Sequence, residues 1–415
     1  MRFNQNLLIL CDMFPPAFGP RMGYLCKYLT RMGWRVTVVT EQIPEKTFSF
    51  LAGEAEVTYI NYYQAKGRIA QRIEWVGVML LDLLFHYKDR RMERVAKRLL
   101  RDGDYRAILC STYRAFPLPA ARRLAERSGL PLVVDLRDIV EQYPKEEYVT
   151  HRLFPGLPLL DKAVARLFRH RLLADRNRAL RMASAVTTVS PWHVELLKRY
   201  NPQVKLIYNG FDPELFYPKK VVSERFEITY TGRLLSLAIR DPELLFRAIA
   251  RLNEEGHITP ERLRVVWYID EPSRPIIERE AERLGVSDFM EYHGYVDANE
   301  IPAILNRSSV LLSLANKCDA GGPKGVMTTK LFEFLAVEKP ILCVRSDEAC
   351  LAETIRETHS GLAATDTDEV CRFLLHYYEQ WQRQGYTEVS VNRSQTARYS
   401  REEQAKQFVQ LIEQL

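Results

Sequence analysis

The feature that most constrains the fold is a regular alternation of short β-branched or apolar runs with longer segments of helical periodicity. Six such runs lie in the first half, at 7–11, 36–40, 107–110, 132–135, 185–189 and 205–208. Five more follow, at 227–230, 263–269, 290–293, 310–313 and 340–344. Strands that alternate with helices in this way form parallel sheets from βα units. The sequence therefore predicts an α/β fold with two doubly wound domains.

The boundary between the domains is predicted just after the sixth run. There Asn209-Gly210-Phe211-Asp212-Pro213, and then Pro218, interrupt the pattern with turn residues. The interpretation is an N-terminal Rossmann-like domain at 1–210 and a second one at 211–395. The last run, 400–415, has the periodicity of an amphipathic helix, and a C-terminal helix at 396–415 is expected to cross back to the N-terminal domain.

Composition excludes several classes of protein. The 415 residues are 47% apolar and 27% charged, which excludes a disordered chain and a coiled coil. Seven cysteines, widely spaced and never in a Cys-x-x-Cys pair, indicate neither a disulfide framework nor a zinc site, and they fit a reducing cytoplasm. The N-terminus lacks the pattern of a signal peptide. The longest apolar stretch, 76–85, has ten residues and contains Asp82, so no bilayer-spanning helix is predicted.

Charge is distributed unevenly between the halves. Residues 1–210 hold 34 Lys and Arg against 20 Asp and Glu, a balance of +14, whereas the remaining residues, 25 against 33, balance at −8. A basic half suits nucleic acid, an anionic membrane or a phosphorylated substrate, and it also suits a solvated surface with no partner.

Residues 66–101 concentrate this basic charge around an apolar patch. Ten Lys and Arg surround the segment 75–81, which contains Trp75 and Leu80. That composition is typical of a helix lying in a membrane interface. One or two amphipathic helices packed on the sheet, with a solvated basic face, would give the same pattern, and both interpretations stay open.

The loop after the first strand is a candidate ligand loop. It contains Gly19 and leads into a helix at about Arg21, so free backbone amides would point at the sheet edge where ligands of doubly wound sheets bind. The loop is neither Gly-x-Gly-x-x-Gly nor a Walker loop, which disfavours a dinucleotide cofactor and P-loop chemistry.

A second candidate site follows the first strand of the second domain. Gly232 and Arg233 end that strand, and Arg240 lies seven residues further on. Two guanidinium groups at a strand's carboxyl end can converge on a diphosphate and bind its oxygens bidentately. The alternative is that Arg240 pairs only with Asp241 or with solvent.

The segment 321–336 adds a helix start with suitable chemistry. Thr328 or Thr329 can cap a helix beginning at Lys330, whose free amides would suit a phosphate. Glu333, about one turn in, can accept hydrogen bonds from the two hydroxyls of a ribose. An amphipathic helix with an exposed glutamate is the simpler alternative.

In the first domain, the strand ending at 134–138 supplies carboxylates. Asp135 or Asp138 could accept a proton from an acceptor hydroxyl, and Arg137 could instead neutralise either of them in a structural pair. Asp102-Gly103-Asp104 has the spacing of an Asp-x-Asp metal motif, but it precedes a strand, where Asp-Gly is an ordinary turn.

Together these motifs resemble the GT-B glycosyltransferases of the family 4 type (glycosyl transferases group 1). The resemblance rests on Val186-Thr-Thr-Val-Ser-Pro, Lys205-Leu-Ile-Tyr-Asn-Gly-Phe-Asp, Gly232-Arg233, and Lys330-Leu-Phe-Glu-Phe-Leu-Ala with Lys339-Pro-Ile-Leu, in that order along nearly the whole chain. It implies two Rossmann-like domains facing across a cleft and a metal-independent hexosyl transferase without a cofactor.

The resemblance also assigns roles to residues. Arg233 and Arg240 would hold the donor's diphosphate, Glu333 its ribose, and Gly19 would face the transferred sugar or the acceptor. Gly232, Thr328, Thr329 and Lys330 complete the expected donor site, and Asp138 is the candidate on the acceptor side. The family pattern has a second glutamate eight positions before the ribose-binding one. Here that position is Gly325, although a subgroup with Gly-x-x-x-x-Lys-x-x-Glu lacks the glutamate too.

The resulting hypothesis is a cytoplasmic glycosyltransferase, peripheral on the inner face of the cell membrane. It would move a sugar, with retention by family analogy, from a nucleotide diphosphate sugar to a polysaccharide or lipid-linked glycan. An anionic membrane surface is the expected further partner, and nucleic acid is not. Two rival hypotheses are a nucleotide-sugar epimerase of the same fold and a non-catalytic nucleotide- or membrane-binding scaffold.

Overall fold

The computed structural model describes residues 5–142, 156–234, 236–237, 240–314, 327–344 and 349–415. Within these residues the chain divides into two compact units. The first unit is Met1–Tyr208 together with Gln404–Leu415, and the second is Asn209–Glu403. The C-terminal helix α14 (Arg401–Glu413) therefore belongs mainly to the first unit, although nearly two hundred residues of the second unit precede it.

The first unit is built on a parallel sheet of seven strands in the order β3-β2-β1-β4-β5-β6-β7. The strands are β1 (Asn6–Cys11), β2 (Arg35–Glu41), β3 (Glu56–Ile60), β4 (Ala107–Thr112), β5 (Leu132–Leu136), β6 (Ala185–Thr188) and β7 (Val204–Leu206). The helices are α1 (Pro20–Arg31), α2 (Arg68–Phe85), α3 (Tyr87–Asp102), α4 (Leu118–Ser128), α5 (Pro158–Met182) and α6 (Pro191–Leu197), with short 3₁₀ turns η1 (Ser49–Leu51) and η2 (Val140–Gln142). The order of strands reverses between β1 and β4, and ligands of such sheets bind at this switch point.

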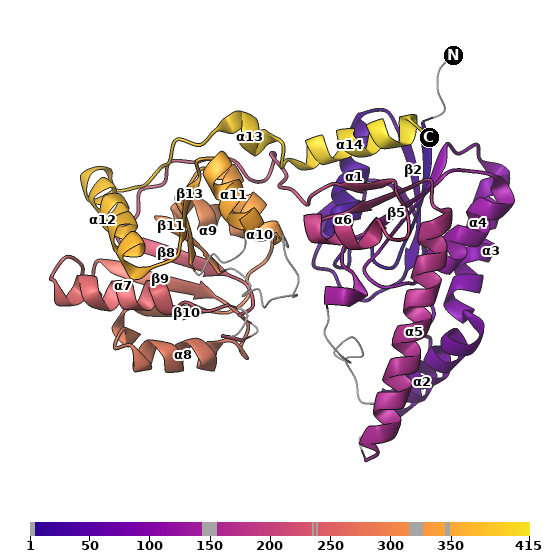
Figure 1. Cartoon of the computed structure of the whole chain (residues 1–415), viewed down its shortest axis with the longest axis horizontal. Helices are drawn as coiled ribbons and strands as arrows, with labels where there is room; N and C mark the ends of the chain where they lie inside the picture. The colour runs from indigo at the N-terminus through magenta and orange to yellow at the C-terminus, as the bar shows by residue number, and fades with distance from the viewer. Residues whose placement is uncertain (1–4, 143–155, 235, 238–239, 315–326, 345–348) are drawn as a thin grey trace. The chain divides into compact units, whose positions relative to one another are not determined.

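Helices cover both faces of this sheet (Figure 1). Because side chains alternate along a strand, Leu8 and Leu10 pack with α3, α4 and α5 on one face, while Leu7 and Ile9 pack on the other. On that second face the partners come from α1 and from α14, whose Phe408 is fully buried.

The second unit is built on a parallel sheet of six strands in the order β10-β9-β8-β11-β12-β13. The strands are β8 (Phe226–Thr231), β9 (Leu263–Tyr268), β10 (Met290–His293), β11 (Val310–Leu314), β12 (Ile341–Val344) and β13 (Gly361–Ala364). The helices are α7 (Glu243–Glu254), α8 (Arg274–Arg283), α9 (Ile301–Arg307), α10 (Thr329–Ala336), α11 (Ala349–Glu357), α12 (Thr367–Gln384) and α13 (Arg393–Ala397), with a 3₁₀ turn η3 (Ser287–Phe289). The switch point lies between β8 and β11.

The predicted α/β class is confirmed, and each of the eleven predicted runs contains a strand within a few residues of its predicted bounds. Two strands were not predicted, β3 and β13, and both are edge strands. The segment Glu56–Ile60 mixes polar with apolar residues and is only partly buried. The segment Gly361–Ala364 consists mostly of residues with weak strand propensity. Within the described residues no helix is both long and apolar enough to cross a membrane.

Candidate functional site

The candidate donor site begins at the carboxyl end of β8, beside the switch point of the second sheet. Gly232 follows that strand with φ +122°, a region that favours glycine, and its amide donates to the Tyr268 carbonyl at 2.7 Å. A Cβ atom at Gly232 would lie 1.3 Å from Nζ of Lys330. The glycine therefore lets the Lys330 ammonium sit directly over the end of the strand.

The two arginines of the motif lie next to each other here. Arg240 donates through Nη1 to the Arg233 carbonyl and to the Tyr230 hydroxyl at 3.3 Å. Arg240 is therefore held against the backbone of Arg233 and the hydroxyl group of Tyr230. The Arg233 side chain is 64% exposed. Its Nε atom donates to the Tyr295 hydroxyl at 2.9 Å and lies 3.9 Å from an oxygen of Asp270.

Lys330 joins this cationic group from α10. Its Nζ atom lies 5.5 Å from the ring centre of Tyr230. Burial lowers the pKa of Lys330 to about 8, and the charges of Arg240 and Arg233 act in the same direction, while Glu333 and Asp270 oppose them. The neighbouring arginine charges add to the effect of burial, and a bound diphosphate would neutralise them.

Glu333 lies on the same helix, one turn after Lys330. Burial raises the pKa of Glu333 to about 7, although the charges of Lys330 and Arg401 act in the opposite direction. A carboxyl group that titrates near neutrality can accept hydrogen bonds when ionised and donate one when protonated, and both suit vicinal hydroxyls.

The start of α10 differs in detail from the prediction. The helix begins at Thr329, with Thr328 in the N-cap position, and the Thr328 side chain makes no capping hydrogen bond. The prediction of a threonine side-chain cap was therefore wrong, although the predicted helix start was off by only one residue. Leu331, Phe334 and Leu335 are buried, as their spacing indicated. Gly325 lies outside the described residues.

The geometry of Gly232 leads to a first testable prediction. Gly232→Ala should destabilise the second unit by about 1–3 kcal/mol, because an L residue is strained at this φ, and it should displace the Lys330 ammonium. Thermal unfolding and nucleotide binding can be measured on the same sample. Gly256→Ala, at φ +75° with open space around the Cβ position, is the control, because it also places an alanine at a positive φ but does not touch the site. Equal nucleotide affinity in both variants would contradict the packing role of Gly232.

The Gly19 loop lies at the corresponding edge of the first sheet, between β1 and α1. A Cβ atom at Gly19 would lie 2.7 Å from Cα of Phe14, so the loop folds tightly on itself. The neighbouring Phe18 is half-exposed, and its ring lies 5.6 Å from that of Phe48 on the loop after β2. This aromatic contact joins two loops that are far apart in sequence, and sequence motifs gave no signal for it.

Asp135, at the carboxyl end of β5, has a structural role. Its oxygens accept from Arg21 (Nη2 at 2.8 Å, Nε at 3.0 Å), from Ser111 at 2.8 Å and from Thr187 at 2.7 Å. Burial alone would raise the pKa of Asp135, but the charge of Arg21 and these hydrogen bonds outweigh it and lower the pKa. Because four donor groups already surround the carboxylate, it is not available as a base.

Arg137 pairs with Asp12, which follows β1. One of the two interpretations of the sequence paired Arg137 with Asp135 or Asp138, and no hydrogen bond of this kind is formed between these described residues. Asp138 accepts from the Gln142 side chain at 3.0 Å. Burial raises the pKa of Asp138, opposed by Gln142 and the charge of Arg137, and Asp12 adds to the rise. In this respect Asp138 differs from Asp135, whose pKa is lowered.

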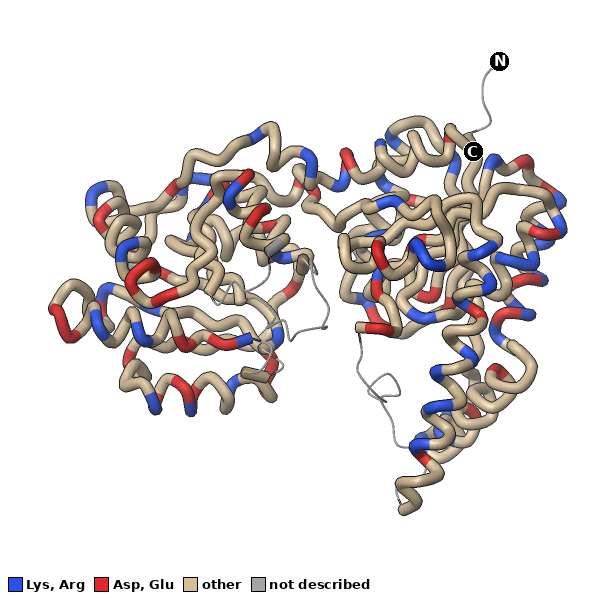
Figure 2. Tube along the Cα trace, viewed as in Figure 1, with Lys and Arg blue, Asp and Glu red and all other residues tan. Residues whose placement is uncertain are grey.

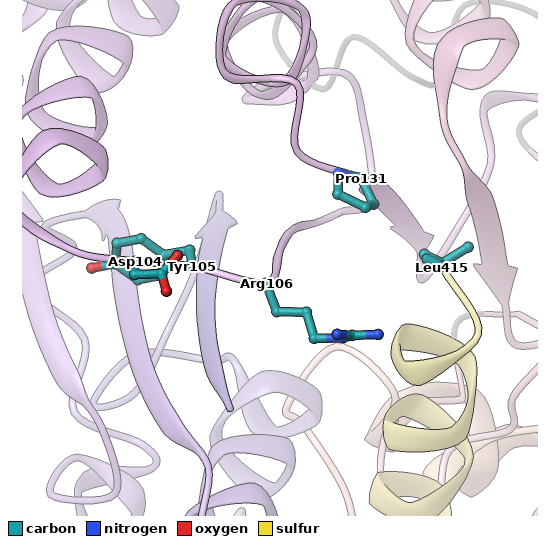
Figure 3. Close-up of a pocket in the computed structure, with 5 residues that line it drawn as sticks. All are labelled: Asp104, Tyr105, Arg106, Pro131 and Leu415. Atoms are coloured by element: carbon teal, nitrogen blue, oxygen red, sulfur yellow. The ribbon is translucent and has the colours of Figure 1, made fainter. Parts of the chain in front are cut away.

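A shallow cavity of about 190 Å³ lies elsewhere in the first unit, lined by Asp104, Tyr105, Arg106, Pro131 and Leu415 (Figure 3). Four of its five residues lie just before β4 or β5, so the cavity is at the amino ends of these strands. Ligands of doubly wound sheets bind at the other edge, so this cavity is no part of the candidate site. The loop of Asp102-Gly103-Asp104 is the turn between α3 and β4, as predicted.

The structure thus brings together Gly232, Arg233, Arg240, Lys330 and Glu333 in the second unit, while Gly19 and Asp138 lie in the first. It also adds Asp270 after β9 and Tyr295 after β10, which the sequence analysis missed. Strand order makes these residues neighbours of Arg233. The only sequence signal was their position just after predicted strands.

The whole chain is similar in fold to several solved structures. Sucrose-phosphate synthase from Thermosynechococcus elongatus matches with a TM-score of 0.62 at 14% identity over 99% of this chain and 98% of the other. Anabaena Alr3699/HepE in complex with UDP-glucose matches with a TM-score of 0.61 at 15% identity, over 99% of this chain and 100% of the other. The lipopolysaccharide outer core galactosyltransferase WaaB matches with a TM-score of 0.55 at 10% identity, over 99% of this chain and 100% of the other. At these identities the likeness establishes the fold.

A search of the curated proteins finds no match to this sequence. The model of the glycosyl transferase 4-like domain matches residues 18–210, nearly all of the first unit up to its C-terminal helix. The predicted resemblance is therefore confirmed. Residues 18–210 thus match the glycosyl transferase 4-like domain, and the chain that contains them has the GT-B fold.

Proposed function

We propose that the protein transfers a hexosyl group from a nucleotide diphosphate sugar to a polysaccharide or lipid-linked glycan on the cytoplasmic side of a membrane. The second unit binds the donor, with Arg233, Arg240 and Lys330 at the diphosphate and Glu333 at the ribose. Gly232, Thr328 and Thr329 shape this donor site. The first unit receives the acceptor beside Gly19 and Asp138.

The observation that carries the proposal is the convergence of three cations at one strand end. Lys330 lies over Gly232, and Arg240 donates to the carbonyl of Arg233, so these charges share one small region at the switch point. Such a group of cations with few balancing carboxylates suits a ligand with more than one negative charge. HepE, which shares the fold, is a UDP and UDP-glucose complex in its solved structures.

The arrangement is suited to the chemistry of glycosyl transfer. As the bond between the anomeric carbon and the diphosphate oxygen breaks, the electron pair leaves with the diphosphate and the sugar becomes oxocarbenium-like. An acceptor hydroxyl oxygen forms the new glycosidic bond and loses its proton. Arginines aimed at the diphosphate stabilise the transition state more than the bound substrate, because the charge develops there. Asp138 is the proposed acceptor of the hydroxyl proton, and the reaction is proposed to retain anomeric configuration without a metal ion.

A thermal-shift screen tests the donor site directly. A nucleoside diphosphate at about 100 times its dissociation constant should stabilise the protein by about 2.7 kcal/mol, which corresponds to several degrees in the melting temperature. We expect one of UDP, GDP, TDP and CDP to give this shift, inorganic phosphate at the same concentration not to, and Lys330→Met to lose it. Arg274→Ala, an exposed arginine on α8, is the control that keeps it.

If none of the four diphosphates moves the transition of folded protein, the proposed donor site is wrong. Product analysis with the best-binding nucleotide sugar then identifies the reaction. A new glycosidic bond supports the transferase, whereas an epimerised sugar, or binding without turnover, supports one of the two rival hypotheses.

A further inference from the structure

Exposed apolar side chains of the first unit are concentrated on two helices. Of 19 large apolar side chains that are exposed in the described residues, eight lie on α2 and four lie between Leu157 and Leu167, at the start of α5. A cluster of this kind is unusual on the surface of a water-soluble domain and marks a site of interaction.

On α2 the exposed residues form a continuous stripe. Five of them recur at helical spacing along the outer face: Ile69, Ile73, Val76, Leu80 and Leu84. The opposite face supplies Val78, the one buried residue of this helix. Trp75 and Phe85 flank the stripe and are also exposed. The 18 residues of α2 give the stripe a length of about 27 Å.

The start of α5 continues the same composition. Leu159 is 82% exposed, and with Ala163 and Leu167 it forms a row at steps of four residues. Lys162 and Arg166 lie beside this row and are exposed as well. Figure 2 shows Lys and Arg distributed along the whole of α5. Long cationic side chains can cover apolar surface with their stems while their charged ends reach lipid headgroups.

The two acidic residues of α2 are only partly exposed, and both are bound to backbone amides. Glu74 accepts from the amides of Gln64 at 2.9 Å and Ala65 at 2.8 Å, and Asp82 accepts from the amide of Lys88 at 2.8 Å. Both carboxylates are used to fix the ends of neighbouring segments. Arg68 and Arg72, the two basic residues of α2, are exposed in its first turns beside the apolar stripe.

The lengths of the helices place this surface at one edge of the sheet. The 25 residues of α5 span about 37 Å, whereas β5, which precedes it, spans about 17 Å. The end of α5 is packed in the core through Ala179 and Leu180 just before β6 begins, so its start extends beyond the carboxyl ends of the strands. Figure 1 shows α2 and the start of α5 extending in the same direction beyond the sheet. His86, at the end of α2, lies 3.8 Å from Asp175 of α5.

We propose that α2 and residues 157–167, together called the α2/α5 surface, lie in the interface of an anionic membrane. Amphipathic helices with a cationic border and an interfacial tryptophan bind in this way, and they do not span the bilayer. A second copy of the chain would bring like charges together on this face, and nucleic acid would leave the apolar stripe in water. An anionic membrane would bury the apolar stripe and bind the cationic side chains beside it.

The inference deepens the proposed function by naming the acceptor as lipid-linked. The α2/α5 surface lies on the side of the first sheet where Gly19 and Asp138 follow their strands. A membrane held there would present a lipid-linked glycan to these residues. This conclusion rests on the proposed function, whereas membrane binding itself can be tested without any turnover.

Vesicle flotation of the full chain tests the α2/α5 surface. Binding to vesicles of phosphatidylcholine with phosphatidylglycerol should exceed binding to phosphatidylcholine alone, and it should weaken as salt rises. Ile73→Ser with Leu80→Ser, and separately Leu159→Ser with Leu167→Ser, should each reduce binding by about 10-fold or more, because each pair removes buried apolar area. Arg72→Gln with Arg166→Gln should reduce the dependence on phosphatidylglycerol.

Val222→Ser is the matched control, since Val222 is 71% exposed in the second unit and should not affect flotation. All these positions are exposed, so the variants should keep the melting temperature and the nucleotide-induced shift of the wild type. Unchanged flotation in both apolar variants, or equal recovery with and without phosphatidylglycerol, contradicts the proposal that the α2/α5 surface binds an anionic membrane. Neither result affects the proposed donor site. A dimer in light scattering without vesicles that dissociates in the α2 variant would assign the stripe to a second copy instead.

Discussion

Replacing Arg233 by alanine should lower turnover by about 100-fold, equivalent to about 2.7 kcal/mol of transition-state stabilisation. The guanidinium has few contacts in the free protein, a 2.9 Å hydrogen bond to Tyr295 and a 3.9 Å approach to Asp270. Its charge is therefore available to the departing diphosphate, where its contact strengthens as the bond to the sugar breaks. Release of nucleoside diphosphate from the best-binding donor measures the rate.

The expected loss can be separated from unfolding. Because the Arg233 side chain is largely exposed, its removal should change the free energy of unfolding by less than about 0.5 kcal/mol. Arg274→Ala in the same unit removes an arginine of similar exposure, and it should keep full turnover. Glu333→Ala should instead weaken donor binding more than it slows turnover, because a ribose contact is made equally in the ground and transition states. Wild-type turnover in Arg233→Ala would remove this residue from the site.

Replacing Asp135 by leucine should destabilise the first unit by about 3–5 kcal/mol, because it leaves the Arg21 guanidinium buried without its counter-ion. The pair is almost completely buried, and Arg21 also donates to the carbonyl groups of Ile207 and Tyr208 and lies 5.6 Å from the ring centre of Phe408. Urea unfolding followed by near-ultraviolet circular dichroism measures the loss. Arg274→Leu, which breaks an exposed pair with Glu278, should cost at most about 1 kcal/mol.

The double variant Arg21→Met with Asp135→Leu distinguishes charge from packing. It removes both buried charges at similar volume, so it should regain much of the lost stability. A double variant as unstable as the sum of the two single changes would show that hydrogen bonds to Ser111, Thr187 and the backbone matter more than the ion pair. The folded-state pKa of Asp135 is lowered, so its contribution is present above the ordinary aspartate pKa of about 3.9 and is lost as the pH falls through the folded-state value.

Arg21 and Asp135 also illustrate what the sequence can predict. The strand ending at Asp135 was predicted from its β-branched run, and a charged partner was expected. The nearest candidate, Arg137, was wrong because strand order, which brings residues more than a hundred positions apart to one sheet edge, cannot be deduced from local patterns. In the same way, Gly232, Arg233, Lys330 and Glu333 could be recognised from motifs, whereas Asp270 and Tyr295 required the order of β8, β9 and β10.

Edge strands mark a second limit of prediction. β13 pairs with β12 although Gly361, Ala363 and Ala364 have weak strand propensity. A Cβ atom at Gly361 would lie 1.9 Å from the Ile341 carbonyl oxygen, so close backbone approach forms this strand where side-chain packing does not. Because this segment contains no β-branched residue, the pattern of such residues in the sequence does not predict β13. The central strands, buried on both faces, carry long apolar runs and were predicted within a few residues.

The return of the last helix has a consequence for how the chain folds during synthesis. Ala405, Phe408, Leu411 and Ile412 of α14 are buried against β1 and α1, on the face that Leu7 and Ile9 share. When the ribosome has synthesised the seven strands of the first unit, it has therefore not yet synthesised α14, which completes the core on one face of their sheet. This apolar face remains uncovered while the roughly two hundred residues of the second unit emerge, so the second unit can complete its fold before the first. A nascent chain stalled after Tyr208 would present a sheet whose covering helix does not yet exist.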